Sequence, residues 1–207
     1  YPFDSLVTIS RLYAPDSSFR IFTWNVPLND GTYRYEGMIH WNDVKGPVFL
    51  LSDRSDSLAD LEHQITGSQQ WPGAHYYRII LGKSSDKTYY TLLGWDGYTR
   101  SATRKIIEIL TFDSEGRPVF GAPVFPDYRK GDQTRVIFEY SSHATMSLKY
   151  ELQSYTVRTN RNRYRPRYKS VTARMIVFDH LEPMDPSVTG QYSFYIPVGN
   201  IYDAFVF

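Results

Sequence analysis

The sequence predicts an all-β protein, and three observations support this prediction. Aromatic residues make up 16% of the 207 residues, with 18 Tyr and 12 Phe, and aromatic side chains suit a half-buried pleated surface. Apolar and polar residues alternate along Phe19–Val26 and Thr32–Trp41, which is the period of a strand. Turn residues separate such segments at short intervals. The spacing predicts roughly a dozen strands.

Three pairs of these segments have the form of β-hairpins. Asn29-Asp30-Gly31 joins the first two strands, and this turn tolerates positive φ. His75–Leu81 and Thr88–Trp95 predict a second hairpin, and Thr134–Tyr140 with Met146–Leu152 predict a third. Segments that are neighbours in sequence tend to pair. The hairpins therefore predict an antiparallel meander.

One segment after the third strand interrupts the pattern. Ser55-Asp56-Ser57 is a capping sequence, and Leu58, Leu61 and Ile65 follow it at helical spacing. We expect at most one short helix near residues 57–66, with a polar loop as the alternative.

The number of strands limits the architecture, because a sheet of this size must curl, split or close. Two solutions compete: a propeller-like array with three or four strands to a blade, and a two-sheet sandwich or open barrel. Arg104–Phe112 reads as a strand, and the apolar run Arg174–His180 suits a central strand. No repeat of fixed period is visible, which counts against a regular propeller. We expect a single all-β domain over residues 1–207.

Composition excludes several classes of function. The chain has no cysteine, so it has neither a disulfide framework nor a thiol nucleophile nor a Cys-ligated metal. Its net charge of +1 lacks the basic excess of a nucleic-acid binder. No stretch approaches the ~20 apolar residues of a membrane helix. The first residue is Tyr1, and we expect that an N-terminal part of the full-length protein is absent.

Four longer segments suggest a family. Residues 19–37, 89–125, 135–151 and 176–183 together resemble an uncharacterised family of extracytoplasmic proteins from Bacteroidetes-type bacteria. The resemblance implies an exported protein that is periplasmic or associated with the outer membrane, and it carries no catalytic residues. The chain departs from the family near its C-terminus, at Tyr195–Asp203.

Few residues suggest catalysis. Trp95 and Asp96 lie in a Gly-Trp-Asp-Gly turn, which is either a sugar-binding platform with its acid or an ordinary β-turn. Asp179 and His180 point to opposite faces of a strand, so each needs a distant partner such as Asp203 or Glu139. For Trp95 and Asp96 we favour the ordinary β-turn. For Asp179 and His180 we favour isolated polar groups without a catalytic role.

No metal or cofactor site is predicted. The five histidines do not have the spacing that would aim two of them at one metal ion, and they are His40, His63, His75, His143 and His180. The glycines form neither a dinucleotide fingerprint nor a phosphate loop, and no nucleophile elbow of a serine hydrolase is present.

The most unusual segment is a basic loop with interleaved tyrosines. Arginine forks match phosphate and carboxylate groups, and tyrosine rings stack. The candidate residues for binding an anionic partner are Arg158, Arg161, Arg163, Tyr164, Arg165, Arg167, Tyr168 and Lys169. The alternative is a solvated connector between two strands, and the two readings have similar weight.

These observations favour a non-catalytic binding or assembly module of the cell envelope. Its partners are expected to be envelope proteins, anionic lipid or anionic glycan, and not nucleic acid. The alternative is a carbohydrate-active hydrolase whose Asp/Glu pair converges in a pocket beside Trp95 or Trp71.

Overall fold

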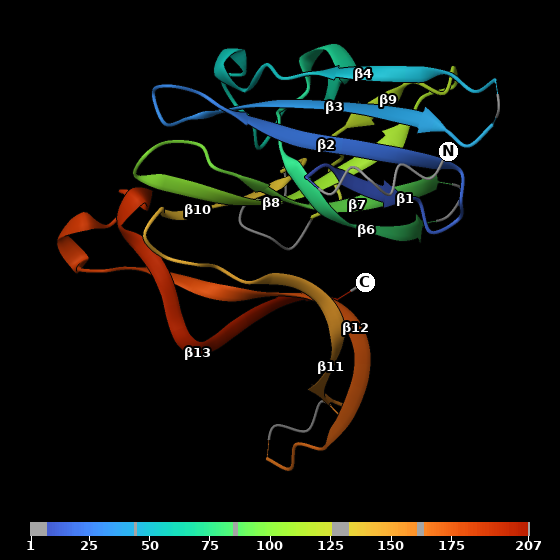
Figure 1. The fold of residues 1–207 in the computed structure, drawn as a ribbon. Helices are drawn as coiled ribbons and strands as arrows, with labels where there is room; N and C mark the ends of the chain where they lie inside the picture. Colours follow the sequence, from blue (N-terminus) through green and yellow to red (C-terminus); the bar gives the residue numbers. More distant parts are fainter. Residues whose placement is uncertain (1–7, 44, 85–86, 126–132, 161–163, 207) are drawn as a thin grey trace.

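The structure is a computed structural model that describes residues 8–43, 45–84, 87–125, 133–160 and 164–206. In these residues thirteen strands form three antiparallel sheets, which confirms the all-β prediction. The sheets are stacked, with the second sheet between the first and the third (Figure 1). The arrangement is sandwich-like, so the propeller-like alternative is wrong. The structure has the two stacked sheets of the predicted sandwich and adds a third sheet to them.

The first sheet is a meander of four strands. Its order is β1 (Ser10–Tyr13), β2 (Phe19–Pro27), β3 (Tyr33–Trp41) and β4 (Val48–Ser52). The predicted turn between β2 and β3 is present, with Gly31 at φ +82°. The carboxylate of Asp30 accepts a hydrogen bond from the Thr32 amide at 2.9 Å, which fixes this turn locally.

The second sheet forms the middle layer. In the order β5-β9-β8-β7-β6, with β10 also paired to β8, it contains β5 (Thr66–Gly67), β6 (His75–Ser84), β7 (Lys87–Asp96), β8 (Ala102–Phe112), β9 (Pro118–Phe120) and β10 (Val136–Ser141). Strand β9 pairs with the end of β8 and β10 pairs with its beginning. The predicted β6–β7 hairpin is confirmed.

The third sheet consists of β11 (Leu148–Arg158), β12 (Tyr168–Pro183) and β13 (Tyr195–Val206) in that order. The third predicted hairpin is wrong, because β10 pairs with β8 and β11 pairs with β12. Burial explains the difference. Phe138 of β10, in the second sheet, packs against Phe178 of β12, in the third sheet, with ring centroids 4.6 Å apart. The turn after β10 therefore carries the chain from one layer to the next.

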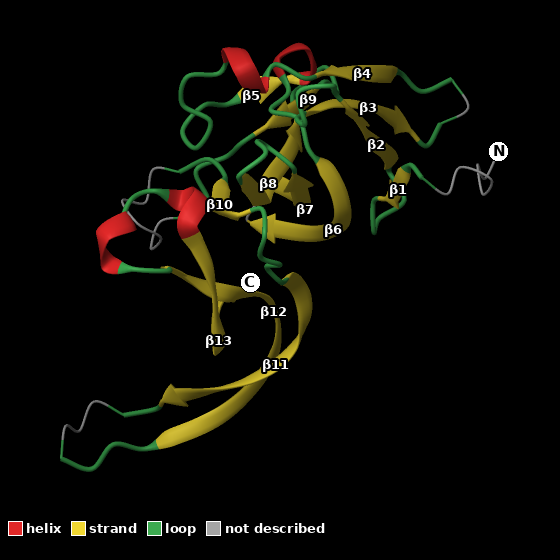
Figure 2. Ribbon diagram, turned by 60° about the vertical axis from the view of Figure 1, so that its left-hand side comes forward, coloured by secondary structure: helices red, strands yellow, loops and turns green. Residues whose placement is uncertain are grey.

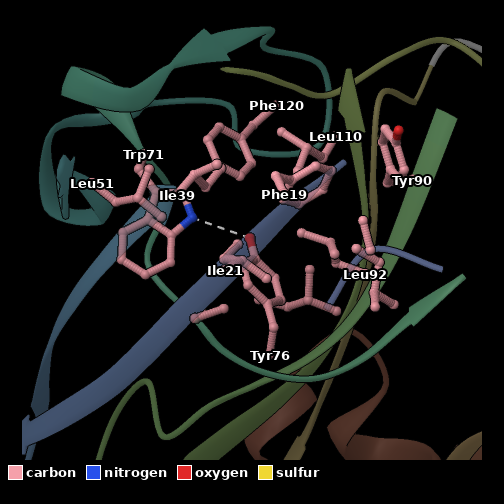
Figure 3. Packing of buried hydrophobic residues seen from close by; sticks show 14 of the residues in the cluster. Phe19, Ile21, Ile39, Leu51, Trp71, Tyr76, Tyr90, Leu92, Leu110 and Phe120 are labelled. Carbon is pink, nitrogen blue, oxygen red and sulfur yellow. Dashed lines mark hydrogen bonds between the residues drawn. The ribbon is translucent and has the colours of Figure 1, made fainter. Parts of the chain in front are cut away.

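Two hydrophobic clusters hold the layers together. The first lies between the first and second sheets and is centred on Phe19, Ile21 and Leu110 (Figure 3). The second lies between the second and third sheets. Consecutive residues of β7 divide between the clusters, with Leu92 in one and Leu93 in the other. The middle sheet is thus buried on both faces, which explains its nearly continuous apolar runs.

One ion pair lies inside this apolar middle layer. The Nε of Arg135 donates to Oε2 of Glu108 at 2.8 Å, and the two side chains are 1% and 0% exposed. Burial raises the pKa of Glu108, and the positive charge of Arg135 opposes this shift. Arg135 also donates to the carbonyl oxygens of Leu61 and Phe120. The pair thereby fastens the loop before β5 to the second sheet.

The predicted helix near residues 57–66 does not form, and the polar-loop alternative holds. The described residues contain only short 3-10 turns, at η1 (Ser55–Ser57), η2 (Ser68–Gln70), η3 (Pro186–Val188) and η4 (Tyr192–Phe194). The carboxylate of Asp53 accepts from the Ser55 amide and hydroxyl, and Ile65 is exposed rather than buried. Across the described ranges, no helix has the length and apolarity needed to cross a membrane.

Candidate functional site

A large cleft opens where the loop after β4, one end of the second sheet and the third sheet meet. Its volume is about 1780 Å³. The loop contributes residues 53–62, the second sheet contributes Asp96, Arg104 and Glu139, and the third sheet contributes residues 178–181 and 203–206. Small-molecule pockets usually measure about 300–1,000 Å³. The cleft is therefore large enough for a polymer or a polypeptide segment.

The second sheet supplies a row of three charges. Arg104 of β8 is the register partner of Asp96 on β7 and of Glu139 on β10. Its Nε and Nη2 donate to Oε2 of Glu139 at 2.9 and 2.8 Å, and its Nη1 lies 4.0 Å from Oδ2 of Asp96. Adjacent strands are about 4.8 Å apart, so the arginine stands between two carboxylates on the same face.

Asp96 has the most perturbed environment in this row. Burial raises its pKa, although the Tyr98 amide donates to Oδ1 at 2.8 Å and Arg104 lies nearby. The guanidinium of Arg104 stacks on the Tyr98 ring, with its central carbon 3.1 Å from the ring centroid. A buried acid with a raised pKa in a cleft is a candidate functional group.

The third sheet adds a second polar cluster. His180 Nδ1 lies 2.7 Å from Oδ2 of Asp203, and its Nε2 lies 3.7 Å from Glu182. Asp179 accepts from the Ser147 amide at 2.7 Å. The sequence predicted that Asp179 and His180 need separate partners, and in the structure Asp179 contacts Ser147 and His180 contacts Asp203. The β12–β13 register shifts between Asp179 and Leu181, and both Asp179 and His180 line the cleft.

Neither tryptophan proposed for a sugar platform lines the cleft. Trp71 is 0% exposed in the first core cluster, where its indole N–H donates to the Tyr76 hydroxyl at 3.1 Å (Figure 3). Trp95 packs against Tyr33 with ring centroids 5.4 Å apart. The predicted pocket that combines Asp/Glu with Trp71 or Trp95 is therefore absent from the described residues.

The cleft is strongly acidic. Nine carboxylates and three guanidinium groups are part of its lining. Asp56, Asp60 and Glu62 stand on the loop after β4, and Asp203 stands on β13. Sequence reasoning missed this concentration because the acids are spread over most of the chain. Only the folding of three separate sheets places them around one cavity.

The basic segment lies at the far end of the third sheet. We define the arm as residues Leu152–Arg174, the distal part of the β11–β12 hairpin. It extends away from the rest of the protein (Figure 2). Its seven rungs, from Leu152↔Arg174 to Arg158↔Tyr168, span roughly 23 Å at the usual rise of a strand.

The arm carries most of the predicted anion-binding residues at its tip. Tyr164 is 95% exposed and Tyr168 is 62% exposed. The tip is held by Asn160, whose side chain donates to the Arg165 carbonyl and accepts from the Arg167 amide. Arg158, Tyr164, Arg165, Arg167, Tyr168 and Lys169 are all exposed. Arg161 and Arg163 lie outside the described residues.

Comparisons with protein-family models, curated proteins and solved structures find no match to this chain. Within the described ranges, no group of three or more His, Asp or Glu side chains is placed to hold a metal ion.

Proposed function

We propose that this protein is a non-catalytic binding or assembly module of the cell envelope that engages an anionic partner through its arm. The observation that carries the proposal is the arm itself. It is a long hairpin that projects into solvent and has seven cations and no acidic residue between Leu152 and Phe178.

The energetics of the arm favour a binding role over a structural one. A two-stranded hairpin alone is marginally stable in water. Leu152 is 61% exposed, and Val157 and Tyr168 are exposed as well, so these side chains contribute little to the core. Tyrosine and arginine are enriched at protein interfaces. A hairpin that presents these residues to solvent is typical of a surface that binds a partner.

The proposed location is periplasmic or outer-membrane-associated, and it rests on the sequence resemblance. In that setting the anions available to the arm are protein carboxylates, lipid headgroups and acidic glycans. Arginine forks suit each of these groups. Nucleic acid is not a proposed partner.

The test is photo-crosslinking at one arm position in cells that produce the native protein. A photoreactive amino acid replaces Tyr168 in the arm and, as the matched control, the exposed Tyr13 of β1. We expect reproducible adducts from position 168 and none from position 13. Equal labelling at both positions, or none at either, contradicts the proposal.

A second variant separates binding from folding. Replacing Arg161, Arg163, Arg165 and Arg167 with Ser removes four of the seven cations of the basic segment. Arg165 and Arg167 are exposed, and Arg161 and Arg163 lie outside the described residues. We expect the thermal midpoint to stay nearly unchanged and the crosslink at position 168 to weaken. An undiminished crosslink would mean that the basic residues form a solvated connector between two strands and take no part in binding.

The alternative function is a carbohydrate-active hydrolase, and one observation favours it. The cleft contains Asp96, whose pKa is raised by burial, and Glu139 on the same sheet face. Against it, Arg104 binds Glu139 through two nitrogens and lies between the acids, whereas a glycosidase needs one acid and one carboxylate facing the substrate.

This alternative is tested by incubating the protein with acidic and neutral polysaccharides and measuring the reducing ends that appear. Activity that is lost in both Asp96→Asn and Glu139→Gln supports hydrolysis. The Glu36→Gln variant changes a half-exposed carboxylate of β3 outside the cleft and serves as the matched control. Absence of any released reducing end removes the hydrolase from consideration.

A further inference from the structure

The cleft presents two exposed tyrosine rings. Tyr98 follows β7 and is 39% exposed, and Tyr192 belongs to η4 and is 48% exposed. Both residues line the cleft. Ligand sites are commonly lined by aromatic side chains together with a few fixed polar groups. The two rings therefore offer surfaces on which a flat, partly apolar ligand can stack.

The row of three charges on the second sheet lies between the elements that carry these rings. The guanidinium of Arg104 on β8 stacks on the Tyr98 ring. Turn η4, which carries Tyr192, packs against β10, the strand of Glu139, and the red turns before β13 lie beside β10 (Figure 2). The Tyr192 ring is supported by Tyr195, with ring centroids 5.0 Å apart. Polar groups and aromatic faces thus occur together in one part of the cleft.

The charged groups of this row are held in place and retain capacity for further hydrogen bonds. A guanidinium has five N–H donors, and a carboxylate has about four lone-pair sites. Arg104 directs its Nε and Nη2 to the same oxygen of Glu139, and the Tyr98 amide donates to Oδ1 of Asp96. The remaining donors and acceptors suit a ligand rich in hydroxyl groups, because a hydroxyl both donates and accepts.

We propose that the cleft binds a neutral glycan chain, whose sugar rings stack on Tyr98 and Tyr192 and whose hydroxyl groups bond to the row of charges. A sugar ring has C–H faces that match the negative face of an aromatic ring. The volume of about 1780 Å³ exceeds that of a usual small-molecule site, which favours a chain over a single sugar. The site is separate from the arm, so this inference goes beyond the proposed function, and it involves no bond cleavage.

The charge of the cleft decides which class of polymer it accepts. Nine carboxylates and three guanidinium groups line it, so an acidic glycan is repelled. Three of the acids already have partners at 2.7 to 2.8 Å, in the pairs Asp60–His63, Asp203–His180 and Glu139–Arg104. A basic polypeptide would have to compete with these partners. A neutral glycan meets neither obstacle.

The test is isothermal titration calorimetry of the full chain with soluble polymers at low and high salt. The neutral probes are mixed-linkage β-glucan, xylan, galactomannan and dextran, and the charged probes are polygalacturonate and polylysine. Binding of these probes is compared between the wild type and variants of exposed tyrosines.

The cleft variant carries Tyr98→Ala and Tyr192→Ala, and a ring-preserving variant carries Tyr98→Phe and Tyr192→Phe. The matched control carries Tyr13→Ala and Tyr202→Ala, which remove rings that are 52% and 61% exposed and are not part of the cleft lining. Circular dichroism and thermal unfolding establish that each variant folds. If the double Ala variant does not fold, Tyr192→Ala on its exposed turn takes its place.

We expect the wild type and the control to bind at least one neutral polysaccharide, with an affinity that changes little with salt because a neutral ligand has no charge to screen. The cleft variant should bind it at least about tenfold more weakly, a loss typical for removal of aromatic anchors. The ring-preserving variant should keep most of the affinity, because the stacking faces remain. The Ser variant of the arm should bind the glycan as the wild type does.

Three results overturn the inference: no neutral polysaccharide binds, the cleft variant binds as tightly as the wild type, or polygalacturonate binds as tightly as the neutral probes. Binding of polylysine alone, weakened by high salt, identifies a basic polypeptide as the occupant and also overturns it. Each of these results leaves the proposed function intact, because the crosslink at position 168 reports on the arm. A lost crosslink with retained glycan binding contradicts the proposed function alone.

Discussion

The second sheet and the arm are built from similar strands but differ in what surrounds them. Strands β7 and β8 are buried on both faces, with Leu92 and Leu93 both inaccessible to solvent. In the arm, consecutive residues from Leu152 to Ser154 are all exposed. Pairing of strands is therefore present in both regions, whereas packing is present in only one. Stability resides in the layered body, and the arm is free to make contacts outside it.

The largest effect is expected at the buried ion pair of the second sheet. Arg135→Met leaves the carboxylate of Glu108 buried without its partner, which costs about 3–5 kcal/mol of unfolding free energy. Urea unfolding measures the change. The double variant Arg135→Met with Glu108→Gln removes both charges and should lose less stability than the single variant. Equal losses in the two variants contradict an ionised pair.

The next effect compares one residue type in the two regions. Leu92→Ala on β7 empties space in the core and should cost about 2–5 kcal/mol. Leu152→Ala on β11 removes an exposed side chain and should change stability by no more than about 0.5 kcal/mol. Both values come from urea unfolding under one condition. Similar losses at the two positions show that the arm is packed rather than free.

A smaller, pH-dependent effect is expected at Asp96. Burial raises its pKa above the ordinary value of 3.8, so the folded protein binds this proton more tightly than the unfolded chain does. Stability from this group is then present below pH ~4 and is lost as pH rises through the raised folded pKa. Asp96→Asn does not ionise and should gain stability relative to the wild type between pH 4 and pH 7.

Urea unfolding of both proteins across that pH range tests the sign. If the free energy of unfolding of Asp96→Asn instead falls relative to that of the wild type as pH rises, the ionised carboxylate stabilises the fold through Arg104, and this effect outweighs that of burial.

A small effect on stability is also expected from removing most of the arm. Residues 155–171 are replaced by Asn-Gly, which joins the paired Ser154 and Thr172 through a two-residue hairpin turn. The unfolding free energy should change by no more than about 1 kcal/mol, because the deleted rungs pack against no core cluster. A loss of several kcal/mol means that the arm is part of the cooperative unit.

Much of the strand content was predictable because it depends on local pattern. Period-two alternation located β2 and β3, and Asn29-Asp30-Gly31 located their turn. The third hairpin was wrong for a non-local reason. Two adjacent segments with good strand patterns normally pair, but β10 and β11 lie in different sheets. Phe138 of β10 packs instead against Phe178 of β12, in the neighbouring layer.

The site was predictable only in part. The basic segment is contiguous, so its cations were visible in the sequence. The acidic cleft was not, because Asp56, Asp96 and Asp203 are distant along the chain and no spacing rule connects them. Asp96 and His180 were noted as candidates, and Asp203 was named as one possible partner for His180, which the structure confirms. The pairing of Asp96 with Arg104 was missed, because it depends on strand register.

By itself, the sequence determined that the chain forms strands and that one segment concentrates positive charge, because both properties depend on residues that are neighbours. The tertiary structure alone decided that three sheets stack, that the basic segment projects as an arm and that scattered carboxylates surround one cleft. These features depend on which apolar faces bury one another, and that choice is made between residues far apart in the chain.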